Sequence, residues 1–177
     1  MINPIPEGIS MEDRYGELVI SRRWFSSKVF FLLFFAIFWD VFLFSFYKQL
    51  LSGDSVPTMA ALFPLLHVGV GIGITYSVIT GFVNKTVISV SPDLLGIRHT
   101  PLPWRGNRTL HRSDFIQLYV EEVRQKNSVS YRLNAVLNNH KKLKLLSGIY
   151  DRSQAVFFEK EIEKYMGIQD EPISGEA

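Results

Sequence analysis

Two apolar stretches decide the fold of this chain: residues 29–51, VFFLLFFAIFWDVFLFSFYKQLL, and residues 59–82, MAALFPLLHVGVGIGITYSVITGF. Each is long enough to cross a bilayer, which takes roughly 20 mostly apolar residues in a helix rising about 1.5 Å per residue. The segment SGDSVP (52–57) between them leaves room only for a tight turn. The pattern predicts a transmembrane helical hairpin over residues 28–83.

The residues before the hairpin, 1–27, are expected to form an N-terminal segment with a strand at ELVISRRW (17–24). The first apolar run is longer than the apolar region of a secretory signal and lacks an A-x-A cleavage pattern. We therefore expect it to be a retained span.

Charge around the hairpin predicts its orientation. Lys48 and Asp54 nearly cancel at the connecting turn, whereas the flanks on the other side are basic. The positive-inside rule then predicts that both termini are cytoplasmic. The flanking basic residues are Arg22, Arg23, Lys28 and Lys85.

The polar part of the chain, residues 84–166, carries 14 Lys and Arg against 8 Asp and Glu, an excess of about +6. The tail at 169–177 is acidic. The chain has no cysteine, which excludes disulfides, thiolate metal sites and a cysteine nucleophile.

Alternating apolar and polar residues predict a run of short antiparallel strands in this part. Asn138 and Asn139, with His140, are expected to form a hairpin turn, because Asn tolerates positive φ. Asp151 or Ser153 can cap a final helix over 154–166, which Gly167 ends. The fold class is a helical hairpin plus an α+β domain over 84–168. The expected strands are 86–91, 95–100, 115–123, 131–137 and 141–146.

The order of these elements resembles the bacterial pleckstrin-homology-like (PH-like) domain of two-span bacterial membrane proteins. This resemblance implies a bent antiparallel sheet closed by the C-terminal helix, a place in the bacterial inner membrane, and binding of lipids, peptides or proteins. A full PH sheet has seven strands and about six are visible here, so residues 17–24 could supply another. The resemblance rests on the segments 84–88, 102–108, 117–122, 144–148 and 154–166.

Asp40 and His67 are ionisable residues within the two apolar runs. Each lies about 15 Å of helix from the connecting turn, and a charge near the bilayer centre needs a partner. We expect the two side chains to face each other across the hairpin. The pair would serve either as structural glue between the helices or as a proton-responsive site.

The second apolar run contains Gly69, Gly71, Gly73 and Gly81. Gly69 and Gly73 share one helix face at GxxxG spacing, which allows another backbone to approach closely. That backbone would belong either to the first span or to another chain. The pattern alone leaves both alternatives open.

Basic residues of the polar part could contact anionic lipid headgroups or a protein partner. The alternative is a solvated face that merely follows the positive-inside bias. No nucleic-acid-binding motif accompanies the charge. The candidates are Arg98, Arg105, Arg108, Arg112, Lys141, Lys142 and Lys144.

Catalysis finds little support in the sequence. His99, His111 and His140 lack metal-site spacing, and no nucleophile motif or P-loop is present. We expect no enzyme activity, no metal and no cofactor. The leading interpretation is a membrane-anchored PH-like binding or scaffolding module. Two rivals remain: an accessory subunit of a larger membrane complex, and a homo-oligomeric proton- or ion-handling element built on Asp40 and His67.

Overall fold

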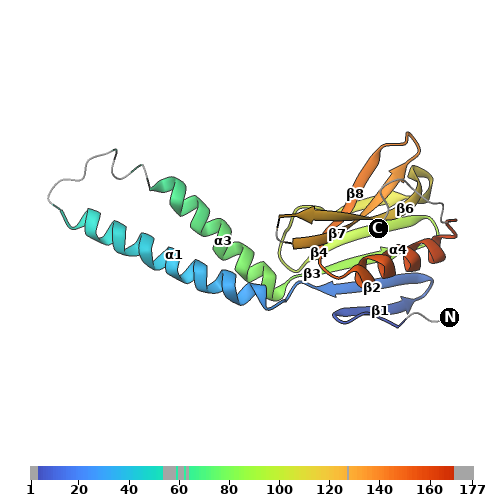
Figure 1. Ribbon diagram of the computed structural model, residues 1–177, viewed down its shortest axis with the longest axis horizontal. Helices are drawn as coiled ribbons and strands as arrows, with labels where there is room; N and C mark the ends of the chain where they lie inside the picture. The colour runs from blue at the N-terminus through green and yellow to red at the C-terminus, as the bar shows by residue number, and fades with distance from the viewer. Residues whose placement is uncertain (1–3, 54–58, 60–61, 63, 127, 170–177) are drawn as a thin grey trace. The chain divides into compact units, whose positions relative to one another are not determined.

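A computed structural model describes residues 4–53, 59, 62, 64–126 and 128–169. The chain divides into two compact units, Met1–Arg23 with Lys85–Ala177, and Trp24–Asn84. The first is an α+β unit and the second a helical hairpin (Figure 1). The N-terminal segment therefore belongs to the same unit as the residues that follow the hairpin. The strand suggested at residues 17–24 is present as Glu17–Arg23 and pairs with the strand Lys85–Val90.

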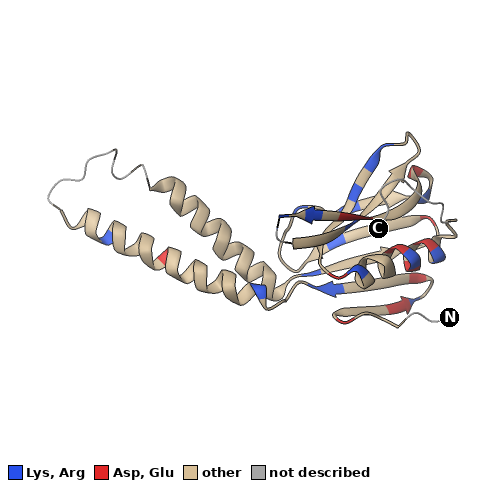
Figure 2. Ribbon diagram, viewed as in Figure 1, with Lys and Arg blue, Asp and Glu red and all other residues tan. Residues whose placement is uncertain are grey.

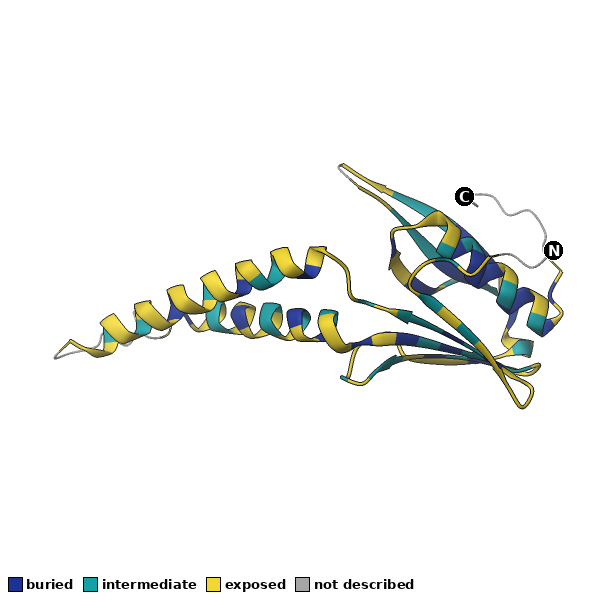
Figure 3. Cartoon of the chain, turned by 90° about the horizontal axis from the view of Figure 1, so that it is seen from below, coloured by how far each residue is buried: buried dark blue, intermediate teal, exposed yellow. Residues whose placement is uncertain are grey.

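The hairpin consists of α1 (Lys28–Leu51) packed against α3 (Leu65–Val83). Both helices are long and apolar enough to cross a membrane, with mean hydropathies of 2.4 and 1.6. Most of their side chains are exposed (Figure 3) and few are charged (Figure 2). The second helix starts after Pro64, later than its apolar run suggests, and most of the predicted turn lies outside the described residues.

Five antiparallel strands form sheet A in the order β1–β2–β3–β4–β5. A two-residue turn joins the first pair, with φ of 50° at Tyr15 and 84° at Gly16. Two positive φ values are typical of a type I′ turn, which matches the twist of neighbouring strands. The strands are β1 (Ile9–Arg14), β2 (Glu17–Arg23), β3 (Lys85–Val90), β4 (Leu94–Thr100) and β5 (Arg108–His111).

Sheet B contains three antiparallel strands, β6 (Phe115–Gln125), β7 (Ser128–Leu137) and β8 (Lys142–Ile149). The predicted turn between the last two is confirmed, but its left-handed residue is His140, with φ of 60°. Asn139 contributes its side-chain oxygen instead, which accepts a hydrogen bond from the backbone of Lys141. A short 3-10 turn, η1 (Arg112–Asp114), links the two sheets.

The final helix α4 (Arg152–Met166) has the predicted caps. Asp151 accepts a hydrogen bond from the backbone of Ser153 at 2.8 Å, and Gly167 ends the helix with φ of 62°. Its buried residues, Phe158 and Ile162 among them, join one core that includes residues of both sheets. Because sheet and helix share this core, the strands and α4 form one cooperative unit.

Candidate functional site

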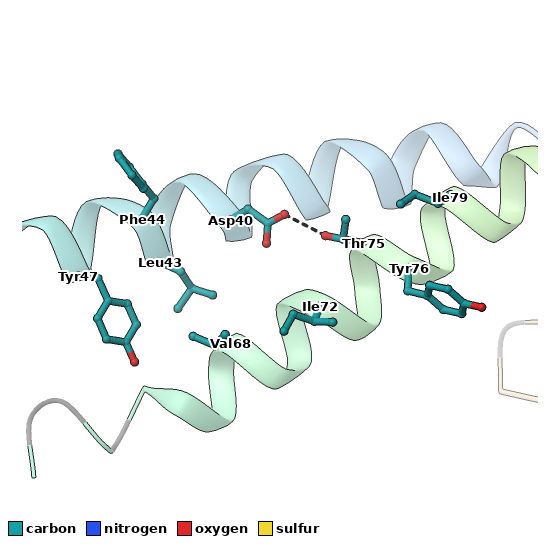
Figure 4. A pocket seen from close by; sticks show the side chains of 9 residues that line it. All are labelled: Asp40, Leu43, Phe44, Tyr47, Val68, Ile72, Thr75, Tyr76 and Ile79. Carbon is teal, nitrogen blue, oxygen red and sulfur yellow. Dashed lines mark hydrogen bonds between the residues drawn. The ribbon is translucent and has the colours of Figure 1, made fainter. Parts of the chain in front are cut away.

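Asp40 lies near the middle of α1, and its carboxylate reaches toward α3 (Figure 4). Thr75 donates a hydrogen bond from its hydroxyl to Oδ2 of Asp40 at 2.9 Å. A Cβ at Gly71 would lie 3.1 Å from the other carboxylate oxygen. The missing side chain at Gly71 therefore makes room for the carboxylate between the helices.

His67, near the start of α3, packs against Trp39 of α1. Its ring stacks on Trp39, with ring centroids 5.9 Å apart, and Trp39 Nε1 donates to the backbone carbonyl of His67 at 3.1 Å. The hydrogen bond to Asp40 comes instead from Thr75, eight residues or about 12 Å further along α3. The hydrogen bond that Asp40 accepts across the hairpin is thus from Thr75, and the ring of His67 lies against Trp39.

A groove of about 560 Å³ opens between the helices next to Asp40 (Figure 4). Its walls are mostly apolar, and among the described residues that line it Asp40 alone carries a formal negative charge. A carboxylate in hydrocarbon normally acquires a proton or a cationic partner. The groove is lined by Asp40, Leu43, Phe44, Tyr47, Val68, Ile72, Thr75, Tyr76 and Ile79.

Gly71 and Gly81 are the glycines of α3 that lie close to side chains of α1. A Cβ at Gly81 would lie 3.0 Å from a methyl group of Val29, and Gly71 is similarly close to Trp39. Among the described residues, nothing lies within 4 Å of a Cβ built at Gly69 or Gly73. The GxxxG face therefore points away from α1.

The predicted basic residues are distributed over both sheets and the loops that precede them. Arg112 donates to the carbonyl oxygen of Phe115 at 2.9 Å, and Lys142 lies 4.9 Å from the ring centroid of Tyr119. These two have structural contacts within the unit. Lys144 shares sheet B with Lys142, whereas Arg98 and Arg108 are in sheet A, Arg105 precedes β5, and Lys141 precedes β8.

Arg98 and Arg108 line a hollow of about 320 Å³ on sheet A. The hollow depends on Gly96, where a Cβ would lie 2.7 Å from the hydroxyl of Ser89. Hydroxyl groups of Ser89, Ser91 and Thr109 also belong to its lining, together with Glu17. The site offers hydrogen-bond donors and positive charge to an anionic group.

Sequence reasoning missed that Arg98 shares its face of sheet A with Arg23 and Lys85. Arg23 pairs directly with Lys85, and Lys85 is two residues from Val87, the partner of Arg98. Alternation along paired strands puts all three on the same face. The alternation along each strand predicts which face a residue occupies. Only the strand register shows that Arg23 and Lys85, 62 positions apart in the sequence, lie opposite each other.

His99 is held on the opposite face of β4. Its Nδ1 lies 3.0 Å from the hydroxyl of Thr86, and its backbone N–H donates to Asn107. Burial lowers the pKa of His99, because desolvation disfavours the charged ring. Within the described part of the chain, no three His, Asp or Glu residues are grouped to hold a metal ion.

Comparison with known protein families and with curated proteins gives no match to this chain.

Proposed function

We propose that this chain is a membrane-anchored binding or scaffolding module without catalytic activity. In this proposal α1 and α3 span the bacterial inner membrane, both termini are cytoplasmic, and the α+β unit is a PH-like domain. Five- and three-stranded antiparallel sheets closed by a C-terminal helix support the PH-like assignment. The unit has one strand more than the seven of a full PH sheet.

One observation carries the proposal: the hairpin is inserted between two neighbouring strands. β2 ends at Arg23 and α1 begins at Lys28, while only Asn84 separates α3 from β3. The backbone N–H of Trp24 donates to the carbonyl of Asn84 at 3.1 Å, which continues the pairing of β2 with β3. An anchor inserted there by such short links keeps the α+β unit next to the membrane.

Membrane insertion and orientation can be tested together. We expect the full chain to stay in the membrane pellet after alkaline carbonate washing, because two apolar spans are held by the hydrophobic effect. A tag after Ala177 should be protected from protease in intact spheroplasts and digested after lysis. Release by carbonate, or digestion in intact spheroplasts, would contradict the proposal.

The groove beside Asp40 favours one second candidate, an accessory subunit whose hairpin packs against another membrane protein. An exposed carboxylate among apolar walls is a place for a partner helix with a basic side chain. The mass of the native particle in mild detergent separates the two functions. A monomer or small oligomer supports the binding module, whereas recovery in a large complex supports the subunit.

A further inference from the structure

The outer face of sheet A carries a cationic cluster of three residues, Arg23, Lys85 and Arg98. The opposite face of these strands is apolar and faces the core, as Ile20, Ile88 and other buried residues show. Each of the three cations lies at a position that alternates with the buried residues of its strand, so each is on the outer face and is exposed. Their proximity is therefore fixed by strand register.

The arrangement is unfavourable for the isolated sheet. Arg23 lies directly opposite Lys85, and like charges at directly opposed positions destabilise a strand pair. Among the described residues none of the three cations has an ion pair. An external anion would remove this repulsion.

Neighbouring arginines show that other cations in the unit do have partners. Arg22 points to the other face, where it donates to the carbonyl of Gly148 at 2.8 Å and burial lowers the pKa of its guanidinium. Arg14, at the far end of the sheet, forms an ion pair with Glu12. Arg23, Lys85 and Arg98 are thus exposed cations without an ion pair among the described residues, and all three lie toward one end of sheet A.

That end is where the chain leaves for α1 and returns from α3. Arg23 is the last residue of β2 and Lys85 the first of β3, one residue after α3 ends. Arg98 pairs with Val87, three residues from Asn84, which is a reach of roughly 10 Å of extended chain. Covalent connection alone keeps the cluster close to the ends of the two apolar helices.

We propose that Arg23, Lys85 and Arg98 bind the phosphate groups of anionic phospholipids in the leaflet that faces the α+β unit. This inference rests on the proposed membrane anchor and names the ligand of the module. The cluster would hold the outer face of sheet A against the headgroups and leave the rest of the unit free for a partner. The hollow beside Arg98 supplies hydroxyl donors to the same headgroups.

The test uses the purified full chain in a neutral detergent, titrated with phosphatidylglycerol or phosphatidylcholine and observed by native mass spectrometry. Detergent has no leaflets, so the result does not depend on orientation in a membrane. Replacing all three cations by Gln should weaken phosphatidylglycerol binding by at least about tenfold. Each basic residue near an anionic surface adds a similar amount to the binding free energy, so the three losses accumulate. Arg98→Gln alone, which leaves both helix flanks intact, should weaken it by a few-fold.

The matched control removes three exposed cations elsewhere, Arg14, Lys126 and Lys160, also by Gln. Binding in this control should equal that of the parent chain, and phosphatidylcholine should bind weakly to every variant. Equal weakening in the control, or unchanged binding in the triple variant, would overturn the inference. Displacement of the lipid by inorganic phosphate at constant ionic strength would also do so, because it would indicate a site for free phosphate.

Failure of this inference is distinguishable from failure of the proposed function. A chain that resists carbonate extraction but binds phosphatidylglycerol equally in all variants retains its anchor and loses only the lipid assignment. A chain that carbonate releases has no membrane anchor, and then both proposals fail.

Discussion

The α+β unit and the hairpin achieve close packing in different ways. In the α+β unit large apolar side chains such as Phe158 and Leu118 are buried completely, and the hydrophobic effect drives their association. In the hairpin many phenylalanines, Phe34 among them, are exposed, while Gly71 and Gly81 leave no room for a side chain beside α1. Lipid does not drive apolar helices together, so in the proposed membrane location these helices would rely on close approach and a few polar contacts.

Two acidic side chains, one buried and one exposed, also differ between the units. Glu163 of α4 is buried in the α+β unit and accepts a hydrogen bond from the backbone N–H of Leu118 at 3.1 Å. Asp40 is exposed in the hairpin and accepts from the hydroxyl of Thr75. A carboxylate thus connects helix to strand in one unit and helix to helix in the other.

The largest expected effect comes from the core of the α+β unit. Phe158→Ala should lower the free energy of unfolding by about 3–5 kcal/mol, because it removes a fully buried ring and leaves a cavity. The matched variant Phe34→Ala removes the same ring from the exposed surface of α1 and should leave that free energy unchanged. Denaturant unfolding of the full chain in detergent, observed by near-ultraviolet circular dichroism, checks both. Equal losses would contradict the distinction between the units.

A smaller effect is expected where the helices touch. Gly81→Val should destabilise the hairpin by about 1–3 kcal/mol, since its Cβ would meet Val29 at 3.0 Å. Gly73→Val, which meets nothing within 4 Å among the described residues, is the control. Unfolding in mixed micelles of rising SDS content measures both. A larger loss for Gly73→Val would show that the GxxxG face is an interface with another chain.

Composition alone was enough to predict the two apolar helices, and α1 lies within one residue of its predicted start. It could not predict how they rotate about their axes, because nearly every face of α1 is apolar. The contact of Asp40 with Thr75 depends on that rotation, and depth alone pointed to His67.

Two strands of sheet A were missed for local reasons. β1 contains few apolar residues, and only the Tyr15–Gly16 turn beside β2 signals it. β5 has four residues and follows a segment broken by Pro101, Pro103 and Gly106. The strands with clear alternation, such as β3 and β6, were predicted, since a half-buried face imposes that pattern.

In the α+β unit a pH effect near neutral pH is expected at His99. Burial lowers its pKa from the ordinary 6.5, so the unfolded chain takes up a proton first as pH falls. With respect to His99, the free energy of unfolding is therefore highest above pH 6.5. It decreases as pH falls from there toward the lower pKa of the folded state. His99→Gln should flatten this part of the dependence of melting temperature on pH between 7.5 and 5.5. A slope identical to that of the parent chain would show that His99 does not contribute.

The smallest expected effect is the coupling of Asp40 to Thr75. Polar contacts between membrane helices average about 0.6 kcal/mol, because the separated helices also find partners for their polar groups. Asp40→Asn keeps a side-chain oxygen that can accept the hydrogen bond from the hydroxyl of Thr75. It should therefore destabilise the hairpin less than Asp40→Leu. In a double-mutant cycle of Asp40→Leu with Thr75→Val, the combined loss in mixed micelles should be smaller than the sum of the single losses.

The same cycle with His67→Ala in place of Thr75→Val is the control. Coupling of Asp40 to Thr75 without coupling to His67 would agree with the observed hydrogen bond, in which the hydroxyl of Thr75 donates to Asp40. Coupling to His67 alone would require the helices to rotate relative to this structure, toward the pairing that depth suggests. Additive losses in both cycles would leave the carboxylate without a role in holding the hairpin together. The groove beside it would then be the reason for an acidic residue among apolar ones, since a partner's cation could reach the carboxylate there.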